Sequence, residues 1–475
     1  MLKRVLAWVL LVGFVLLIAN ILVWQFFLEI SIAVYLVIGA FFIFYGKTLI
    51  GRQSKNVELE LDNFEFGYGK GKVFFRIPTK NVLNVIRQNE IASDSKADYI
   101  LNAIRNPIGT PKLDKIIKPG EKIAIVTSDI TRPFPAYKVL PKLIAELKTF
   151  GVKEDDITIV FALGCHRKHT EDEMSALVGE DIYAKIKCID SDMEDCVNFG
   201  KTSFGTPIDI ARPVAQADKV ICIGNIEYHY FAGYSGGAKA IMPGVSSREA
   251  IQSNHSQMVS ELACTGKIEG NPVRIDLEEC IKAFPIHFIV NVVLDEKKEI
   301  VFAVAGDYIE AHRVGCDFLD SIYKVEIDQK ADIVVVTPGG YPKDINLYQA
   351  QKALDNSQNA VKDGGIIILV ASCNELLGEE VFERWYNEAE KPSDLIDRVK
   401  ENFELGGHKA AAIAMLLEKN RIFLVSTMKA EFVKSLFLEP YETVDKAIAA
   451  AVAIKGKDAT ISIMPFGGST LPYIK

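Results

Sequence analysis

Short apolar runs alternate with amphipathic stretches along the chain from about residue 57 onward. The runs are rich in Ile and Val and apolar on both faces, which is typical of strands buried in a parallel sheet. A helical period lies between them, for example at residues 137–149, where Leu140, Leu143 and Leu147 share one face. We predict eight strands: residues 122–127, 157–163, 219–224, 287–294, 332–337, 365–371, 421–426 and 460–464. This alternation predicts an open α/β architecture.

A polar, charged stretch at residues 325–330 stands just before a new predicted strand and marks a domain boundary. We therefore predict two open α/β domains, one at residues 56–328 and one at residues 329–475. Thr170 and Glu173 have the spacing of a capping box, so a helix is expected to begin there.

The first 55 residues differ from the rest of the chain. Residues 5–46 contain a single charge, Glu29, and the two uncharged runs 5–24 and 30–46 approach the roughly 20 residues that a membrane-spanning helix needs. Lysine and arginine flank the region on both sides. This pattern predicts a transmembrane helical hairpin with both ends in the cytoplasm, and hence a membrane-anchored protein with cytoplasmic catalytic domains. A single tilted span and a cleaved signal peptide are the alternatives.

Composition narrows the class of protein. The 475 residues are 49% hydrophobic and 24% charged, which is typical of a folded chain. The net charge of −8 provides no basic surplus, so we expect no nucleic-acid partner. The eight cysteines are scattered without a CxxC pair, which argues against a cysteine zinc site and a disulfide framework and favours a reducing compartment.

Polar sequences follow three of the predicted strands, at residues 128–133, 164–170 and 224–229. Ligand sites of open α/β sheets lie beyond the carboxyl ends of the strands. The chain has only seven histidines, and four of them fall in or soon after these segments: His166, His169, His229 and His255. We predict functional roles for His166 and His229. A structural role is expected for His169, which stands at a helix start, and for His287 and His312.

A glycine-rich loop follows His229. Gly236 and Gly237 would let backbone approach a ligand closely and direct N–H groups at an anion. The spacing to Lys239 excludes a Walker A loop, and no GxGxxG follows a strand. Lys239 could be an ion-pair donor or a covalent nucleophile, and its spacing alone does not choose between them.

Taken together, these segments resemble a known family. The pattern Asp129-x-Thr-Arg-Pro, the sequence Gly-x-His166-Arg, and the run from His229 to Lys239 followed by Asn254-His255 are similar to the nickel-pincer lactate racemases, which interconvert the two hands of 2-hydroxy acids. The resemblance covers about residues 57–475. The hydrophobic N-terminus is not part of the usual pattern of that family.

The resemblance implies a cofactor and a set of roles. The cofactor would be a nickel-pincer nucleotide, a nickel complex of pyridinium-3,5-bisthiocarboxylic acid mononucleotide. Lys239 would hold the cofactor covalently through a thioamide, and His255 would bind nickel. The loop residues Ser235, Gly236 and Gly237 would lie beside the cofactor. The general acid and base groups would be His166 and His229. Substrate-binding residues would be Arg132, Asp129, Gln349, Lys352 and His408.

The implied chemistry explains why such groups are needed. The C–H bond at carbon-2 of a 2-hydroxy acid is too weakly acidic for simple proton removal, whereas loss of the hydroxyl proton and a hydride gives a transient 2-keto acid. Two histidines suit the base role, and Arg132 and Lys352 suit a carboxylate clamp. Because Lys352 belongs to the second predicted domain, the site would lie in the interdomain cleft. Asp129 would orient Arg132 or cap the helix that follows.

Two other classes of function compete with this interpretation. A hydrolase could bind zinc through His166, His229 and His255 and use Glu227 as base, although Lys239 would then have no role. A non-catalytic, membrane-tethered binding protein could have kept the same pocket. The racemase interpretation also requires cofactor-biosynthesis proteins as partners and a small 2-hydroxy acid as substrate.

Overall fold

The computed structural model describes residues 60–90, 98–295 and 297–475, together with scattered positions between 15 and 37. Contacts divide the chain into two units, residues 1–61 and residues 62–475. The second unit contains two six-stranded sheets and four two-stranded ones.

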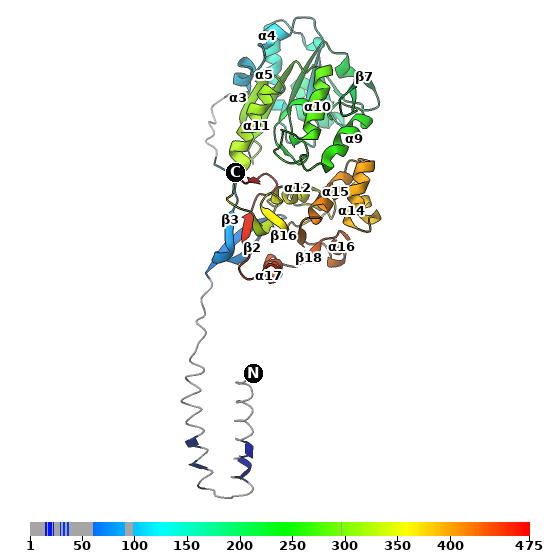
Figure 1. Cartoon of the computed structure of the whole chain (residues 1–475). Helices are drawn as coiled ribbons and strands as arrows, with labels where there is room; N and C mark the ends of the chain where they lie inside the picture. The colour runs from blue at the N-terminus through cyan, green and yellow to red at the C-terminus, as the bar shows by residue number, and fades with distance from the viewer. Residues whose placement is uncertain are drawn as a thin grey trace. The chain divides into compact units, whose positions relative to one another are not determined.

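The first large sheet has the order β13-β12-β9-β4-β5-β6 and is parallel except for β13, which pairs antiparallel with β12. Its strands are β4 (Ile123–Ser128), β5 (Ile157–Ala162), β6 (Lys187–Asp190), β9 (Lys219–Asn225), β12 (Phe288–Leu294) and β13 (Ile300–Gly306). Helices cover both faces (Figure 1). One face packs on α3 (Tyr99–Arg105) and α5 (Ala136–Thr149), and the other on α10 (Pro272–Ala283) and α11 (Glu310–Tyr323).

The second large sheet is wholly parallel and has the order β18-β17-β16-β15-β19-β3. Its strands are β3 (Val82–Val85), β15 (Ala331–Val336), β16 (Val361–Val370), β17 (Arg421–Val425), β18 (Glu439–Tyr441) and β19 (Ile461–Met464). Residues 82–85 thus join a sheet whose other strands all lie after residue 330. Helix α17 (Val444–Lys455) and the strands β1 (Leu61–Tyr68) and β2 (Gly71–Pro78) cover one face.

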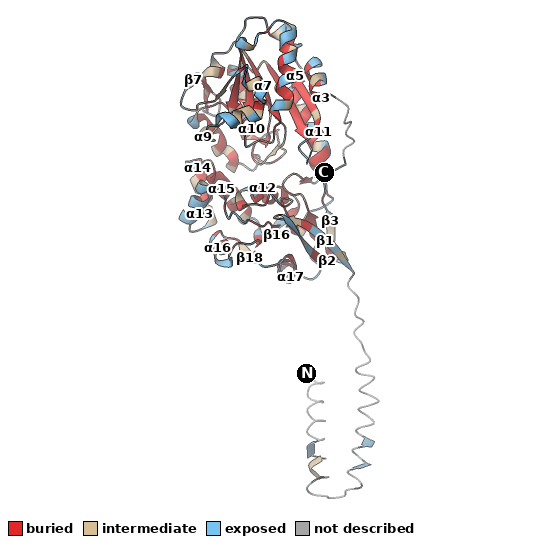
Figure 2. Ribbon diagram, turned by 180° about the vertical axis from the view of Figure 1, so that it is seen from behind, coloured by how far each residue is buried: buried red, intermediate tan, exposed pale blue. Residues whose placement is uncertain are grey.

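The opposite face of this sheet carries the helices that concern the site, among them α12 (Leu347–Ser357) and α15 (Gly407–Leu417). The strands of both sheets are buried between their helices (Figure 2). The remaining helices are α4 (Leu113–Ile116), α6 (Glu171–Val178), α7 (Glu180–Tyr183), α8 (Arg212–Ala215), α9 (Arg248–Ser256), α13 (Glu380–Glu388), α14 (Pro392–Glu401) and α16 (Ala430–Ser435). The paired short strands are β7 (Cys196–Lys201) with β8 (Pro207–Ala211), β10 (Tyr228–His229) with β11 (Gly233–Tyr234), and β14 (Lys324–Glu326) with β20 (Leu471–Tyr473).

The predicted α/β architecture is confirmed. Each of the eight predicted strands coincides with an observed one to within a few residues. Seven of them lie between two parallel neighbours, and the eighth, β12, lies between parallel β9 and antiparallel β13. The helix expected at 137–149 is α5. The expected capping box is also present: the Thr170 hydroxyl accepts from the Glu173 N–H, and the Glu173 carboxylate accepts from the Thr170 N–H.

The predicted membrane hairpin requires correction. Its runs 5–24 and 30–46 lie almost entirely outside the described residues. Within the part of the chain that the structure describes, no helix combines the length and the apolar character needed to cross a bilayer. The prediction of a membrane-anchored protein with cytoplasmic catalytic domains is wrong on this finding.

Candidate active site

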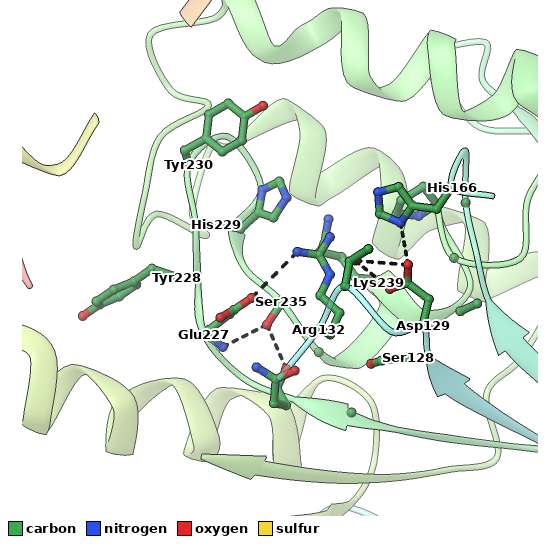
Figure 3. A pocket seen from close by; sticks show the side chains of 18 of the residues that line it. Ser128, Asp129, Arg132, His166, Glu227, Tyr228, His229, Tyr230, Ser235 and Lys239 are labelled. Carbon is green, nitrogen blue, oxygen red and sulfur yellow. Dashed lines mark hydrogen bonds and ion pairs between the residues drawn. The ribbon is translucent and has the colours of Figure 1, made fainter. Parts of the chain in front are cut away.

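A cavity of about 320 Å³ lies beyond the carboxyl ends of β4, β5 and β9. The loops after these strands line one side of it, and side chains from α12 and α15 line the other. Parallel strands end at one edge of their sheet, which brings together polar segments that are distant in the sequence. Figure 3 shows the part of the cavity that the first sheet contributes.

His166 and Asp129 form a close pair at this edge. Nδ1 of His166 lies 2.6 Å from Oδ2 of Asp129, and the Thr131 hydroxyl donates to the same carboxylate at 2.9 Å (Figure 3). Burial alone would raise the pKa of Asp129, but the hydrogen bonds from His166 and Thr131 outweigh it and hold that pKa below its usual value. An ionised Asp129 keeps hydrogen on Nδ1 and leaves Nε2 of His166 as an acceptor.

His229 lies in the two-residue strand β10 and lines the same cavity. Its Nδ1 accepts a long hydrogen bond of 3.3 Å from the Ala232 N–H. Burial, followed by the positive charges of Lys239 and Arg132, lowers the pKa of His229 well below its usual value. The ring is therefore neutral at pH 7, and its hydrogen-bonding state differs from that of His166.

Two positively charged side chains line the cavity. One is Arg132, in the loop after β4, and the other is Lys352, on α12. Arg132 follows β4, and its Nη1 lies 3.8 Å from Oε1 of Glu227. Burial would raise the pKa of Glu227, but Lys352 and Arg132 keep it below its usual value. Glu227 thus holds a negative charge beside the two cations. A substrate carboxylate could bind the same cations, since a guanidinium offers two parallel donors.

A buried arginine forms hydrogen bonds to the glycine-rich loop. Arg274 is fully buried, and its guanidinium donates to the carbonyl oxygens of Ala232 and Tyr234. The cavity lining includes Ser235 and Gly236, whereas Gly237 is buried and donates its N–H to Oδ1 of Asn291 at 2.9 Å.

Lys239 lines the cavity near the middle of this loop. Burial, and then the charges of Arg132 and Arg274, lower the pKa of Lys239 well below its usual value. A larger fraction of this amine is therefore neutral at pH 7 than for an ordinary lysine. A neutral amine in an enclosed cavity has the property that a covalent nucleophile needs.

His255 sits at the end of α9 with one ring nitrogen engaged. Its Nδ1 lies 2.9 Å from Oδ1 of Asn254. The Asn254 amide nitrogen donates to Oδ2 of Asp276 at 2.8 Å and to the Val273 carbonyl, so Oδ1 must face the histidine. The contact thereby assigns the hydrogen to Nδ1 and leaves Nε2 of His255 with a lone pair. This is the arrangement that a metal-binding histidine needs.

The second sheet contributes the opposite wall. Gln349 and Lys352 lie one turn apart on α12 and both line the cavity, as their spacing predicts. His408, at the start of α15, is buried against the rings of Tyr230, Phe231 and Phe403. Burial and the neighbouring Lys409 lower the pKa of His408 to about 3. Every predicted site residue except Gly237 therefore lies at one cavity.

Several side chains in or behind the site were not singled out from the sequence. Asp276 is buried and accepts hydrogen bonds from Thr202, Thr206, Asn254 and Gln257. Tyr230, from the loop after β10, and Lys409, from α15, also line the cavity. Only the neighbours of Tyr230 and Lys409 in the sequence, His229 and His408, pointed to this region.

The remaining histidines are engaged elsewhere, as expected. Nδ1 of His169 lies 2.6 Å from Asp190, and its Nε2 accepts from the Ile130 N–H, so His169 fixes the loop after β4. Among the described residues, no three His, Cys, Asp or Glu side chains converge in a way that could hold a metal. The zinc-hydrolase alternative requires such a trio and is not favoured.

Comparison with known proteins agrees with this geometry. The family models of the lactate racemase N-terminal domain and C-terminal domain match residues 68–266 and 327–471. The chain is 34% identical to lactate racemase of Thermoanaerobacterium thermosaccharolyticum over 86% of this chain and 99% of that protein. It is 33% identical to lactate racemase of Lactiplantibacillus plantarum over 78% and 90%, respectively. The structure of the lactate racemase apoprotein from T. thermosaccharolyticum matches with a TM-score of 0.80, over 86% of this chain and all of that one.

Proposed function

This chain belongs to the lactate racemase family and is an isomerase that racemises a 2-hydroxy acid, and from that premise we propose how it does so. Lys239 would hold a nickel-pincer nucleotide covalently, and His255 would be the protein ligand of its nickel. His166 and His229 move protons, and Arg132 and Lys352 bind the substrate carboxylate together with Gln349. The immediate substrate is lactate or a related 2-hydroxycarboxylate.

The observation that carries this proposal is the contact between His166 and Asp129 at the cavity that Lys352 also lines. Nδ1 of His166 is 2.6 Å from the carboxylate, so its Nε2 can accept the proton of a substrate hydroxyl. His229 supplies a second, neutral imidazole at the same cavity. A racemase acts on both hands of its substrate, and two imidazoles allow a proton to be handled on either face.

The cavity residues also suit the proposed cofactor. The lowered pKa of Lys239 favours the neutral amine that a thioamide bond requires. The Asn254–His255 contact leaves Nε2 free as a nitrogen ligand, which nickel accepts well. When bound, the nucleotide would supply the hydride acceptor and donor, which is chemistry that protein side chains lack.

The residues of the chain perform the remaining tasks. Nε2 of His166 takes the hydroxyl proton as carbon-2 is oxidised, and Asp129 stabilises the imidazolium that results. Arg132 and Lys352 hold the carboxylate of the transient 2-keto acid. The keto group can then present its other face while the acid stays in the cavity. His408, Tyr230 and Phe231 form an aromatic wall that limits water in this part of the cavity. The cofactor also implies dedicated biosynthetic proteins as partners.

The test is to express the full chain in a host that makes the nickel-pincer nucleotide. We expect a covalent adduct on the Lys239 peptide by mass spectrometry, about one nickel per chain, and interconversion of D- and L-lactate or a longer 2-hydroxy acid by chiral chromatography. The matched control is Lys239→Arg, which keeps a basic side chain but cannot form the adduct in the same way.

The two parts of the proposal fail separately. Racemisation by a chain with unmodified Lys239 and no nickel would contradict the cofactor assignment. A fully loaded chain that racemises none of a panel of 2-hydroxy acids would contradict the activity.

A further inference from the structure

The second-domain wall carries a buried lysine that the proposed mechanism does not use. Lys409 lies in the first turn of α15 and is only 6% exposed. Its Nζ donates to the Tyr348 carbonyl at 2.8 Å and lies 3.8 Å from the centre of the Tyr348 ring. Over the described ranges, no carboxylate comes within ion-pair distance of this Nζ. A buried ammonium without an anion is costly, so burial favours the neutral amine of Lys409 until an anion binds beside it.

Neighbouring charges do not neutralise Lys409. Burial lowers its pKa, and Lys352 and Arg132 lower it further because they are also positive. Asp355 and Glu379 act on Lys409 in the opposite sense. Burial raises the pKa of Asp355 to about 7, however, and its oxygens accept from Thr265 and Gln358. Neither carboxylate forms an ion pair with Lys409, so an oxyanion bound beside Lys409 would favour its ammonium form.

An unused donor from the loop after β10 contacts this wall. The Tyr230 hydroxyl is buried and finds no hydrogen-bond partner among the residues that the structure describes. The Tyr230 ring stacks on His408 at 5.9 Å between centroids, and His408 directly precedes Lys409. Buried hydroxyls in folded proteins almost always have a partner, which can be a bound ligand. Tyr230 and Lys409 both line the cavity.

We propose that Lys409 and Tyr230 form a second oxyanion subsite, separate from the carboxylate clamp of Arg132 and Lys352. The ammonium and the hydroxyl would bind carboxylate or phosphate oxygens. Two sources have this chemistry: a second acidic group on the substrate, as in a dicarboxylic 2-hydroxy acid, and the phosphate of a bound nucleotide. The assignment of the source rests on the proposed function, whereas the subsite itself does not.

The subsite can be tested without turnover. Isothermal titration calorimetry of the cofactor-free full chain with inorganic phosphate should give saturable binding. We expect Lys409→Met to weaken it about tenfold or more and Tyr230→Phe, which removes only a hydroxyl, by roughly three- to tenfold. The matched control is Lys419→Met, a lysine just beyond the same helix that contacts Glu261 at the surface. The proposal is overturned if wild-type protein shows no saturable binding, or if all three variants bind alike.

A second measurement on the loaded chain identifies the source. If the substrate supplies the oxyanion, Lys409→Met lowers the ratio of kcat/KM for malate to kcat/KM for lactate about tenfold, and nickel content stays at the level of Lys419→Met. If the nucleotide supplies the oxyanion, the kcat/KM ratio for malate over lactate is unchanged in Lys409→Met, and both the nickel content and the amount of Lys239 adduct fall. Unchanged ratio and unchanged loading together overturn the proposal. Failure of the loaded wild-type chain to racemise any acid would refute the proposed function and leave the calorimetric result to decide on the subsite.

Discussion

Nδ1 of His166 lies 2.6 Å from a carboxylate oxygen of Asp129, although 37 positions separate the two residues in the sequence. The contact exists because β4 and β5 are parallel neighbours, so the loops that follow them emerge side by side. Asp129 is only 3% exposed, and its charge is held by hydrogen bonds rather than by bulk water. A carboxylate in this position fixes both the orientation and the tautomer of the histidine.

Replacing this carboxylate should therefore impair proton transfer more than substrate binding. We expect Asp129→Asn to lower kcat on the order of a hundredfold or more, because the imidazolium loses its counter-charge, with a small change in KM. Thr131→Val is the control, since it removes one donor to Asp129 and leaves the histidine contact intact. Steady-state kinetics with both enantiomers measures the effect. Equal kcat for Asp129→Asn and wild type would refute the role of the pair.

Lys239 should react unusually fast as an amine. Its lowered pKa means that more of it is neutral at pH 7, and each unit of depression raises the neutral fraction about tenfold. Brief reductive methylation of the cofactor-free chain at pH 7, followed by peptide mass spectrometry, should modify Lys239 ahead of an exposed lysine such as Lys400. Arg132→Met should reduce this difference, because Arg132 is one of the charges that lower the pKa. Slower modification of Lys239 than of Lys400 would contradict the prediction.

Much of the architecture was predictable because it depends on local patterns. Buried parallel strands are apolar on both faces, and all eight predicted strands have this character. Strand β3 is different: its sequence Val-Leu-Asn-Val is short and half-buried, and its place beside β19 depends on a contact across more than 370 residues. No pattern within the first domain could indicate that these residues join the second sheet.

The site shows the same division between local and long-range information. The histidines and Lys239 stand in segments whose composition is unusual at the sequence level. Asp276 lies in an amphipathic helix and Lys409 in a helix that is buried almost all round, and their importance comes from what packs against them. The contact of Asp129 with His166 was also not expected, since the sequence suggested that Asp129 would orient Arg132 or cap a helix. The strand order decides which side chains meet at the edge of a sheet, and the sequence alone did not supply that order.

The hydrogen bond between Asn254 and His255 predicts that replacing Asn254 weakens nickel binding. Asn254→Leu removes the acceptor for Nδ1–H, so the ring can turn or change tautomer, and we expect nickel affinity to fall by about 10- to 100-fold. Gln257→Met is the matched control, because it removes another donor to Asp276 without touching His255. Nickel per chain, measured by mass spectrometry at limiting metal, should fall only in the first variant. Similar Tm values for the two variants would separate this effect from a loss of stability, and equal nickel content would contradict the prediction.

Arg274 should contribute strongly to stability. It is fully buried and donates to the Ala232 and Tyr234 carbonyls. In Arg274→Met the Tyr234 carbonyl would lose this charged donor, and the Ala232 carbonyl would keep only the Tyr234 N–H. We expect the free energy of unfolding to fall by about 3 kcal/mol, measured by urea denaturation. Arg313→Met is the comparison: Arg313 also contacts Glu278 but is partly exposed, and its loss should cost about 1 kcal/mol or less. Equal losses in the two variants would contradict the importance of the buried carbonyl contacts.

Asp355 should make the stability of the chain depend on pH. Burial raises its pKa in the folded chain to about 7, against about 3.9 in an unfolded chain. Between these values the folded chain binds more protons at this position than the unfolded chain does. The free energy of unfolding therefore decreases as pH rises from about 4, and this decrease is complete once pH passes about 7. Asp355→Asn cannot ionise, so it should be more stable than wild type at pH 8, by no more than about 4 kcal/mol, and close to it at pH 4. Thr265→Val is the control: it removes the hydroxyl that donates to Asp355 at 2.8 Å but keeps the titrating group, and so it should keep the pH dependence. Urea denaturation of the three proteins from pH 4 to pH 8 measures the slopes. Parallel curves for wild type and Asp355→Asn would show that this carboxyl does not titrate as its burial requires.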